Sequence, residues 1–209
     1  MFDAITNWDV SVLHFIQDHV RADWLDPIMK AITHVGGGGG IFWILLSIGL
    51  SIPKKTRWFG ICAFAALTLS FLINNVMLKS IVGRIRPYEF DPTIICIVGP
   101  ATDTSFPSGH TAAALSTCLG LALATWKKWP KWTAFAMVGF ALLLGFTRLY
   151  VGIHFPSDVL TAVVTASLSA IAVFFICRAV ERKIAEKKGI TELMLSRPLP
   201  AAQPSEKAE

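Results

Sequence analysis

The segment FPSGHTAAALSTCLGLALATW, from Phe106 to Trp126, places a short polar stretch directly before a long apolar run. Proline suits the first turn of a helix, and a serine or threonine just ahead of it can cap free backbone N–H groups. The tetrad Pro107-Ser108-Gly109-His110 therefore predicts a helix start. The apolar run that follows, near residues 110–126, reaches the roughly 17 to 25 residues that a helix needs to cross a hydrocarbon layer. By itself the tetrad is typical of an ordinary helix start, so its meaning depends on the residues around it.

The composition indicates which solvent surrounds this segment. Of the 209 residues, 54% are hydrophobic and only 16% are charged, and the mean hydropathy is +0.57. These values indicate an integral membrane protein rather than a soluble domain. Cys62, Cys118 and Cys177 lie inside apolar runs, which leaves Cys96 without an evident partner and argues against a disulfide framework. The first twenty residues carry acids early and lack a basic start before an apolar core, so no cleavable signal peptide is expected.

Five apolar runs are long enough to be membrane spans. They lie near residues 36–52, 58–78, 110–126, 132–148 and 156–177. The first run opens on five glycines, Gly36 to Gly40, which predict either a closely packed, kinked helix start or a flexible joint. Residues 1–35 mix apolar and charged side chains and predict one or two helices in the membrane interface, and the sequence leaves open whether they lie on the membrane or span it.

The expected fold class is therefore all-α. It is a polytopic membrane helix bundle with five or six transmembrane helices and an N-terminal interfacial helical segment. The predicted domains are the interfacial segment at 1–35, a membrane domain at 36–178 and a basic, partly disordered tail at 179–209.

Lysine and arginine residues mark one face of the predicted bundle. They follow the first, third and fifth spans: Lys54, Lys55, Arg57, Lys127, Lys128, Lys131, Arg178, Arg182, Lys183, Lys187 and Lys188. The positive-inside rule makes this face cytoplasmic. The connections that follow the second and fourth spans lie on the outer face and still contain Lys79, Arg84, Arg86 and Arg148. These four basic residues lie on the face where the positive-inside rule expects few, so their presence there needs a reason other than membrane insertion.

Four helix ends meet at the outer face if the five spans alternate in direction. They carry the segments KSIVGRIRP from position 79, PSGH from position 107 and TRLYVGIHFPSD from position 147. Lys79, Arg86 and Arg148 suit a phosphate dianion, because arginine offers a planar fork to two oxygens and lysine a compact point charge. The helix start adds the backbone N–H groups of Ser108 and Gly109 and the positive end of the helix dipole. The outer face is therefore predicted to bind phosphate.

The two histidines near this face have different neighbours. Pro156 is expected in the first turn of the fifth span, which leaves His154 just outside the helix and places Asp158 in that turn. The Asp158 carboxylate can then reach back to His154, fix one tautomer and make the other ring nitrogen a better nucleophile. His110 has no acid at a matching spacing, which suits a group that gives its proton to a leaving oxygen.

The motifs Lys-x6-Arg-Pro, Pro-Ser-Gly-His and Arg-x5-His-x3-Asp, in that order, resemble the type 2 phosphatidic acid phosphatase superfamily, which includes glucose-6-phosphatase and the vanadium haloperoxidases. They run from Lys79 to Asp158, and the helical organisation around them is similar to that of small bacterial members. The resemblance implies a metal-independent phosphatase with no cofactor, in which His154 attacks phosphorus and forms a phosphohistidine. It implies that His110 protonates the leaving group and that Asp158 supports His154. The residues implied to hold the phosphoryl oxygens are Lys79, Arg86, Ser108, Gly109 and Arg148.

One position departs from the family pattern. Thr147 stands where the family commonly has serine, and it retains a hydroxyl group.

The expected substrate is a lipid phosphate or diphosphate, since a site at helix ends on the membrane surface can receive a headgroup whose tails stay in the bilayer. Small bacterial members of the family act on undecaprenyl diphosphate, phosphatidylglycerophosphate or phosphatidate, and the sequence does not decide among them. The expected partners are this lipid and the bilayer, without nucleic acid, and the oligomeric state is left open. The expected location is the bacterial inner or plasma membrane, with the active site on the extracytoplasmic face.

Two other functions are compatible with the same scaffold. A phosphotransferase would pass the phosphoryl group from His154 to another lipid or sugar, and its acceptor pocket is not readable from the sequence. A non-catalytic membrane scaffold is expected to lack His154, His110 or Arg148, and all three are present.

Residues 91–106 are expected either to dip into the interface beside the site or to form an ordinary ordered loop.

Overall fold

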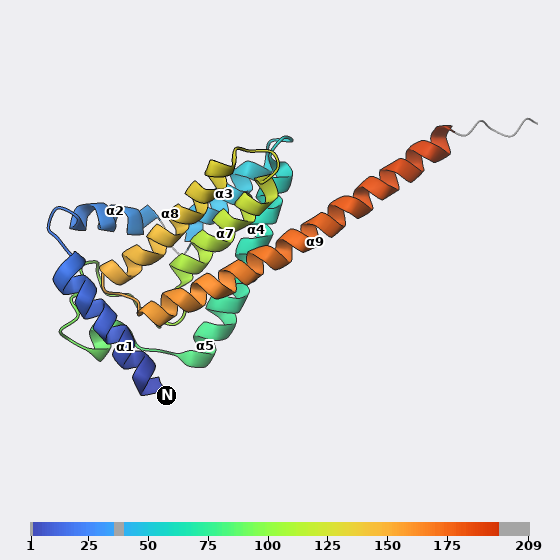
Figure 1. The fold of residues 1–209 in the computed structure, drawn as a ribbon. Helices are drawn as coiled ribbons and strands as arrows, with labels where there is room; N and C mark the ends of the chain where they lie inside the picture. The colour runs from blue at the N-terminus through green and yellow to red at the C-terminus, as the bar shows by residue number, and fades with distance from the viewer. Residues whose placement is uncertain (1, 36–39, 197–209) are drawn as a thin grey trace, which may run out of the picture. The chain divides into compact units, whose positions relative to one another are not determined.

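The computed structural model describes residues 2–35 and 40–196, and all regular elements within these ranges are helices (Figure 1). The all-α prediction is confirmed. The interpretations of Gly36–Gly39 and of the tail from residue 197 lie outside the described residues. No disulfide joins the four cysteines, all of which lie in the described ranges.

The apolar runs of the sequence form five helical stretches. The bounds are α3 at Ile41–Ser51, α4 at Arg57–Phe71, a π-helical segment η3 at Leu72–Leu78, α5 at Lys79–Val82, α7 at Gly109–Thr125, α8 at Lys131–Tyr150 and α9 at Pro156–Ser196. The last four residues of the second stretch, α5, carry the first predicted cation of the site, Lys79. The helix predicted at the opening tetrad begins at Gly109, with Ser108 as its N-cap residue.

The helices at the first and the last predicted span differ in length from those predictions. Three stretches are long and apolar enough to cross a membrane, Arg57–Phe90, Lys131–Tyr150 and Pro156–Lys187, counted over the described part of the chain. Helix α3 has 11 residues, about 16 Å, which is too short to cross a hydrocarbon core of about 30 Å alone. Helix α9 continues beyond residue 177 to Ser196, and from Phe175 it belongs to a second compact unit, described by itself, that contains the exposed pair Arg178–Glu181.

Helix α7 lies between α4 and α8 and forms the centre of the membrane domain (Figure 1). Small side chains allow this packing, since Ala112, Ala114 and Ala141 are buried almost completely. A Cβ atom at Gly120 would lie 3.2 Å from the Cβ of Ala66 on α4, so glycine permits the close approach of these two helices. The start of α7 is thereby fixed in the middle of one end of the bundle.

The N-terminal segment forms two helices, α1 at Phe2–Phe15 and α2 at Asp26–Val35, joined through a π-helical turn η1 at Ile16–Val20. Hydrogen bonds hold this segment to the end of α8: Arg21 Nη2 donates to the Tyr150 carbonyl at 2.8 Å, and the Tyr150 hydroxyl donates to Asp26 Oδ1 at 2.7 Å. The segment therefore packs against the end of the bundle that carries the predicted phosphate site.

The connection between α5 and α7 is an ordered loop that contains the short helix α6 at Pro87–Phe90. Its Ile94 is buried with Leu13 of α1 and with Phe155, just before α9. The Ser105 N–H donates to the Arg84 carbonyl at 2.7 Å and so ties the two ends of the loop together. The part of the loop at 94–98 is packed between the N-terminal segment and the end of α8.

Candidate active site

A cavity of about 120 Å³ lies where the ends of η3, α5, α7 and α8 meet. Its lining residues are Gly40, Asn75, Lys79, Arg86, Ala101, Asp103, Gly109, His110, Arg148 and His154. Six of the eight residues singled out from the sequence therefore line a single cavity, although they come from three separate stretches of chain. The two others, Ser108 and Asp158, lie directly behind it.

The imidazole of His154 is held from both sides. Its Nδ1 lies 3.5 Å from Asp158 Oδ2 and 3.4 Å from Ser105 Oγ, and Ser105 in turn donates to the same carboxylate oxygen. The Phe155 N–H also donates to Asp158 Oδ2, at 2.9 Å, because Pro156 starts α9 and brings Asp158 back over the preceding residues. These neighbours favour a proton on Nδ1 and leave the lone pair on Nε2, the nitrogen nearest Arg86.

Burial decides the charge of this histidine. His154 is 1% exposed, and desolvation lowers its pKa to about 4, although the nearby Asp158 carboxylate acts in the opposite direction. The positive charges of Arg148 and Arg86 lower the pKa further. His154 is therefore neutral at pH 7, which is the state that a nucleophile needs.

Arg86 is fixed by the loop and by the residue before His154. Its Nη1 donates to the Ile153 carbonyl at 2.8 Å and lies 3.5 Å from His154 Nε2, and its Nε donates to the Asp103 carbonyl at 3.0 Å. The side chain of Asp103 forms ion pairs with both Arg86 and Lys79. Partial burial disfavours charge on Asp103, but the hydrogen bond and charge of Lys79 and the charge of Arg86 lower its pKa to about 2.

Arg148 is held by a residue that the sequence did not single out. Its Nη1 donates to Thr33 Oγ1 of α2 at 2.6 Å. The Thr147 hydroxyl donates to the Leu144 carbonyl at 2.6 Å and lies 3.0 Å from Thr33 Oγ1, within hydrogen-bond distance. The Thr147 hydroxyl thus orients Thr33, and Thr33 in turn orients Arg148. The Nε of Arg148 is buried and makes no hydrogen bond to the described residues. A buried guanidinium donor that no protein group engages, beside a cavity, is suited to bind an anion there.

Ser108 bonds with other parts of the protein and does not line the cavity. Its N–H, expected to be free for phosphate, donates to the Asp158 carbonyl at 3.2 Å, and its hydroxyl bonds with that of Thr111 at 3.0 Å. In this structure Ser108 therefore connects α7 to α9, while Gly109 and His110 line the cavity.

A family model described as "PAP2 superfamily" matches residues 59–182, more than half of the chain. The chain belongs to the PAP2 superfamily. The resemblance inferred from the three motifs is confirmed, and the segment matched includes every residue of the cavity except Gly40.

Two PAP2 relatives and one solved structure illustrate the relationship. The chain is 33% identical to the undecaprenyl-diphosphatase of Sulfolobus acidocaldarius over 56% of its own length and 55% of that protein, so the match spans just over half of this relative. It is 34% identical to the undecaprenyl-diphosphatase BcrC of Bacillus subtilis over 77% of its length and 78% of that protein. A crystal structure of a transmembrane PAP2 type phosphatidylglycerolphosphate phosphatase from Bacillus subtilis shares 28% identity and a TM-score of 0.67, covering 87% of this chain and 88% of that one.

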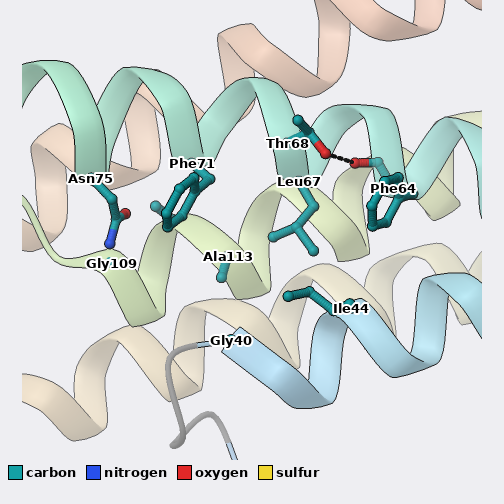
Figure 2. A pocket seen from close by; sticks show the side chains of 10 residues that line it. Gly40, Ile44, Phe64, Leu67, Thr68, Phe71, Asn75, Gly109 and Ala113 are labelled. Atoms are coloured by element: carbon teal, nitrogen blue, oxygen red, sulfur yellow. Dashed lines mark hydrogen bonds between the residues drawn. The ribbon is translucent and has the colours of Figure 1, made fainter.

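A second, apolar cavity of about 170 Å³ adjoins the first in this PAP2 protein (Figure 2). It is lined by side chains of α3, α4 and α7, among them Ile44, Phe64, Leu67, Phe71 and Ala113. Both cavities share Gly40, Asn75 and Gly109. Figure 2 shows the Asn75 amide directed at Gly109, and both of these residues line both cavities.

Proposed function

We propose that the chain is an integral-membrane, metal-independent phosphatase that hydrolyses a lipid phosphate or diphosphate through a phosphohistidine intermediate. The observation that carries the proposal is the cavity that combines a buried, neutral His154 with Lys79, Arg86 and Arg148. Cations with a nucleophile between them suit phosphoryl transfer, because negative charge on the equatorial oxygens must be stabilised while the nucleophile attacks in line.

The proposed reaction has two steps. Nε2 of His154 attacks phosphorus and the bond to the leaving oxygen breaks, while His110, in its protonated imidazolium form, gives that oxygen a proton and becomes neutral. Water then attacks the phosphorus of the phosphohistidine and the bond between phosphorus and Nε2 breaks, while His110 takes the water's proton. Inorganic phosphate is released, and His154 is again neutral. Asp158 and Ser105 hold Nδ1 through both steps, and they stabilise the positive charge that the ring gains on attack.

The apolar cavity supports a lipid as the substrate. A phosphate in the polar cavity would place the first part of an attached acyl or prenyl chain at the boundary formed by Asn75 and Gly109. Ile44, Phe64, Leu67 and Phe71 beyond this boundary are suitable contacts for hydrocarbon. The names of the relatives support the same class, and the candidates are undecaprenyl diphosphate, phosphatidylglycerophosphate and phosphatidate.

The basic connections on the opposite face support a location in the bacterial inner or plasma membrane, with the cavity on the extracytoplasmic face. We place the N-terminal residues 1–35 in the interface at this face, the membrane domain at 36–178 and the basic tail at 179–209 on the cytoplasmic side.

Phosphate release by the purified protein tests the proposal. The panel contains the three candidate lipids and a soluble phosphate ester, in detergent with EDTA present, and His154→Asn is the control. We expect release from at least one lipid, no loss with EDTA and no release by the variant. Equal rates on the soluble ester contradict the lipid assignment. Transfer of phosphate to an added alcohol in preference to water identifies a phosphotransferase instead.

A further inference from the structure

A second charged cluster lies behind the active site and begins in the N-terminal helix. Asp9 of α1 is completely buried, which is costly for a carboxylate unless it is paired. Its partners come from sequence positions far away: Arg84 Nη2 donates to Asp9 Oδ2 at 2.7 Å, and the Ser157 N–H donates to Oδ1 at 2.8 Å. Helix α1 is therefore joined both to the loop after α5 and to the start of α9.

Arg84 connects this cluster to the catalytic pair. Its Nη1 donates to Asp158 Oδ1 at 2.9 Å and to Ser157 Oγ at 2.7 Å, while its other terminal nitrogen is held by Asp9. The guanidinium carbon lies 3.8 Å from the centre of the Phe155 ring. A planar fork bound to two carboxylates and stacked on a ring leaves little freedom of orientation.

The two oxygens of Asp158 then have separate tasks. Oδ1 accepts from Arg84, and Oδ2 accepts from Ser105 and from the Phe155 N–H and lies nearest His154. Because Arg84 occupies Oδ1, the carboxylate cannot rotate without breaking an ion pair in a buried environment. Oδ2 therefore stays directed at Nδ1 of His154.

We propose that Arg84 and Asp9 are positioning residues for the His154–Asp158 pair, so that helix α1 is a working part of the active site. Asp9 fixes Arg84, Arg84 fixes Asp158, and Asp158 fixes the ring that attacks phosphorus. The proposal rests on the proposed phosphatase function, and it assigns a role to Arg84, whose charge on the outer face opposed the topological trend. Neither residue lines the phosphate cavity.

Steady-state kinetics of single variants give the first test. Arg84→Gln is expected to lower kcat roughly 10²-fold, as misplacement of a reacting group does, with KM changed less than about threefold because the cations of the cavity are untouched. Arg84→Lys keeps the charge without the fork and is expected to recover only part of the loss. Asp9→Asn, which keeps the side-chain shape, is expected to lower kcat roughly tenfold.

A matched control separates positioning from simple docking of α1. His14 Nε2 of α1 lies 3.1 Å from Asp91 Oδ2, so this pair also joins α1 to the loop. Neither residue of the pair contacts Asp158 or His154. His14→Gln is therefore expected to keep kcat within about twofold of the unsubstituted protein.

A double-mutant cycle tests whether Arg84 acts through the Asp158 carboxylate. In an Asp158→Asn background, Arg84→Gln should cost less than about threefold, because no carboxylate remains to be positioned. The inference is wrong if Arg84→Gln and Asp9→Asn retain full kcat, if His14→Gln costs as much as Asp9→Asn, or if Arg84→Gln costs 10²-fold in both backgrounds. Failure of the proposed function itself gives a different result, since the unsubstituted protein would then release no phosphate or His154→Asn would remain active.

Discussion

The carboxylate of Asp103 forms an ion pair with Arg86 inside the cavity proposed to bind phosphate. Asp103 also pairs with Lys79, so one protein carboxylate bridges two of the three cations of the site. With a pKa lowered to about 2 it stays ionised at every pH at which the enzyme would work. A phosphate dianion must therefore compete with this carboxylate or share its cations.

Replacement of Asp103 tests this competition. Asp103→Asn is expected to strengthen inhibition by inorganic phosphate roughly fivefold, equivalent to about 1 kcal/mol, because the two cations lose an anionic partner. The inhibition constant at pH 7 is the measurement. Asp91→Asn in the same loop is the control, since Asp91 pairs with His14 away from the cavity. Unchanged inhibition of Asp103→Asn would contradict the competition, and weaker inhibition would show that Asp103 helps to hold the ligand instead.

The charge of His154 predicts a pH dependence. Its pKa is lowered from 6.5 to about 4, chiefly by burial, so the ring is expected to remain neutral at pH 5 and to become protonated near pH 4. The stability that this neutral ring contributes is fully present above pH 6.5 and is lost as the pH falls through about 4. NMR of ¹⁵N-labelled histidine, assigned with His154→Asn, measures the titration. A His154 ring that titrates near 6.5 would contradict the buried, neutral nucleophile.

The contact between Gly109 and Asn75 predicts a steric effect. A Cβ atom at Gly109 would lie 2.9 Å from Asn75 Nδ2, so Gly109→Ala must displace the amide at the boundary of the two cavities. We expect kcat/KM for a lipid phosphate to fall roughly tenfold, with partial recovery when Asn75→Ala is added to the same chain. Gly139→Ala is the control, because nothing lies within 4 Å of its added Cβ. Absence of recovery would mean that Asn75 does not cause the loss.

The convergence of the phosphate-site residues could be predicted because alternating spans bring particular helix ends to one face. The burial of individual side chains, and the contacts between residues that are far apart in the sequence, could not be predicted. Thr33 and Arg148 are 115 positions apart, and Asp9 and Arg84 are 75 apart, so both pairs depend on how the N-terminal helices dock. Ser108 was expected to offer a free N–H, but the close approach of α9 provides the Asp158 carbonyl as its acceptor.

Span lengths were less predictable than span positions. Hydropathy detects apolar length, whereas a helix ends where its backbone conformation changes. Helix α3 begins after Gly40, which has a φ of +90°, and so is shorter than the apolar run that starts at residue 36. The sequence after residue 177 has no proline before Pro198 and is rich in good helix formers, so α9 continues although the apolar run has ended.

The proposed orientation predicts which loops face outward. Single cysteines replace Gly99 and Lys128, both exposed, in a chain whose four native cysteines are removed. An impermeant thiol reagent applied to intact cells is expected to label position 99 and not position 128. The reverse pattern would place the cavity on the cytoplasmic side.

His154 and His110 have different chemical tasks in the proposed mechanism, so their substitutions are expected to fail in different ways. His154 forms the bond to phosphorus, so His154→Asn is expected to abolish turnover and the acid-labile phosphoenzyme trapped from radiolabelled substrate, whatever the leaving group. His110 supplies a proton, so His110→Asn is expected to lose roughly 10² to 10⁴ in rate on a lipid phosphate, whose alkoxide leaves poorly without one. With a nitrophenolate leaving group that need disappears, and His110→Asn should recover much of its phosphoenzyme formation. If His154→Asn still trapped phosphate and His110→Asn never did, His110 would be the nucleophile and His154 the proton donor.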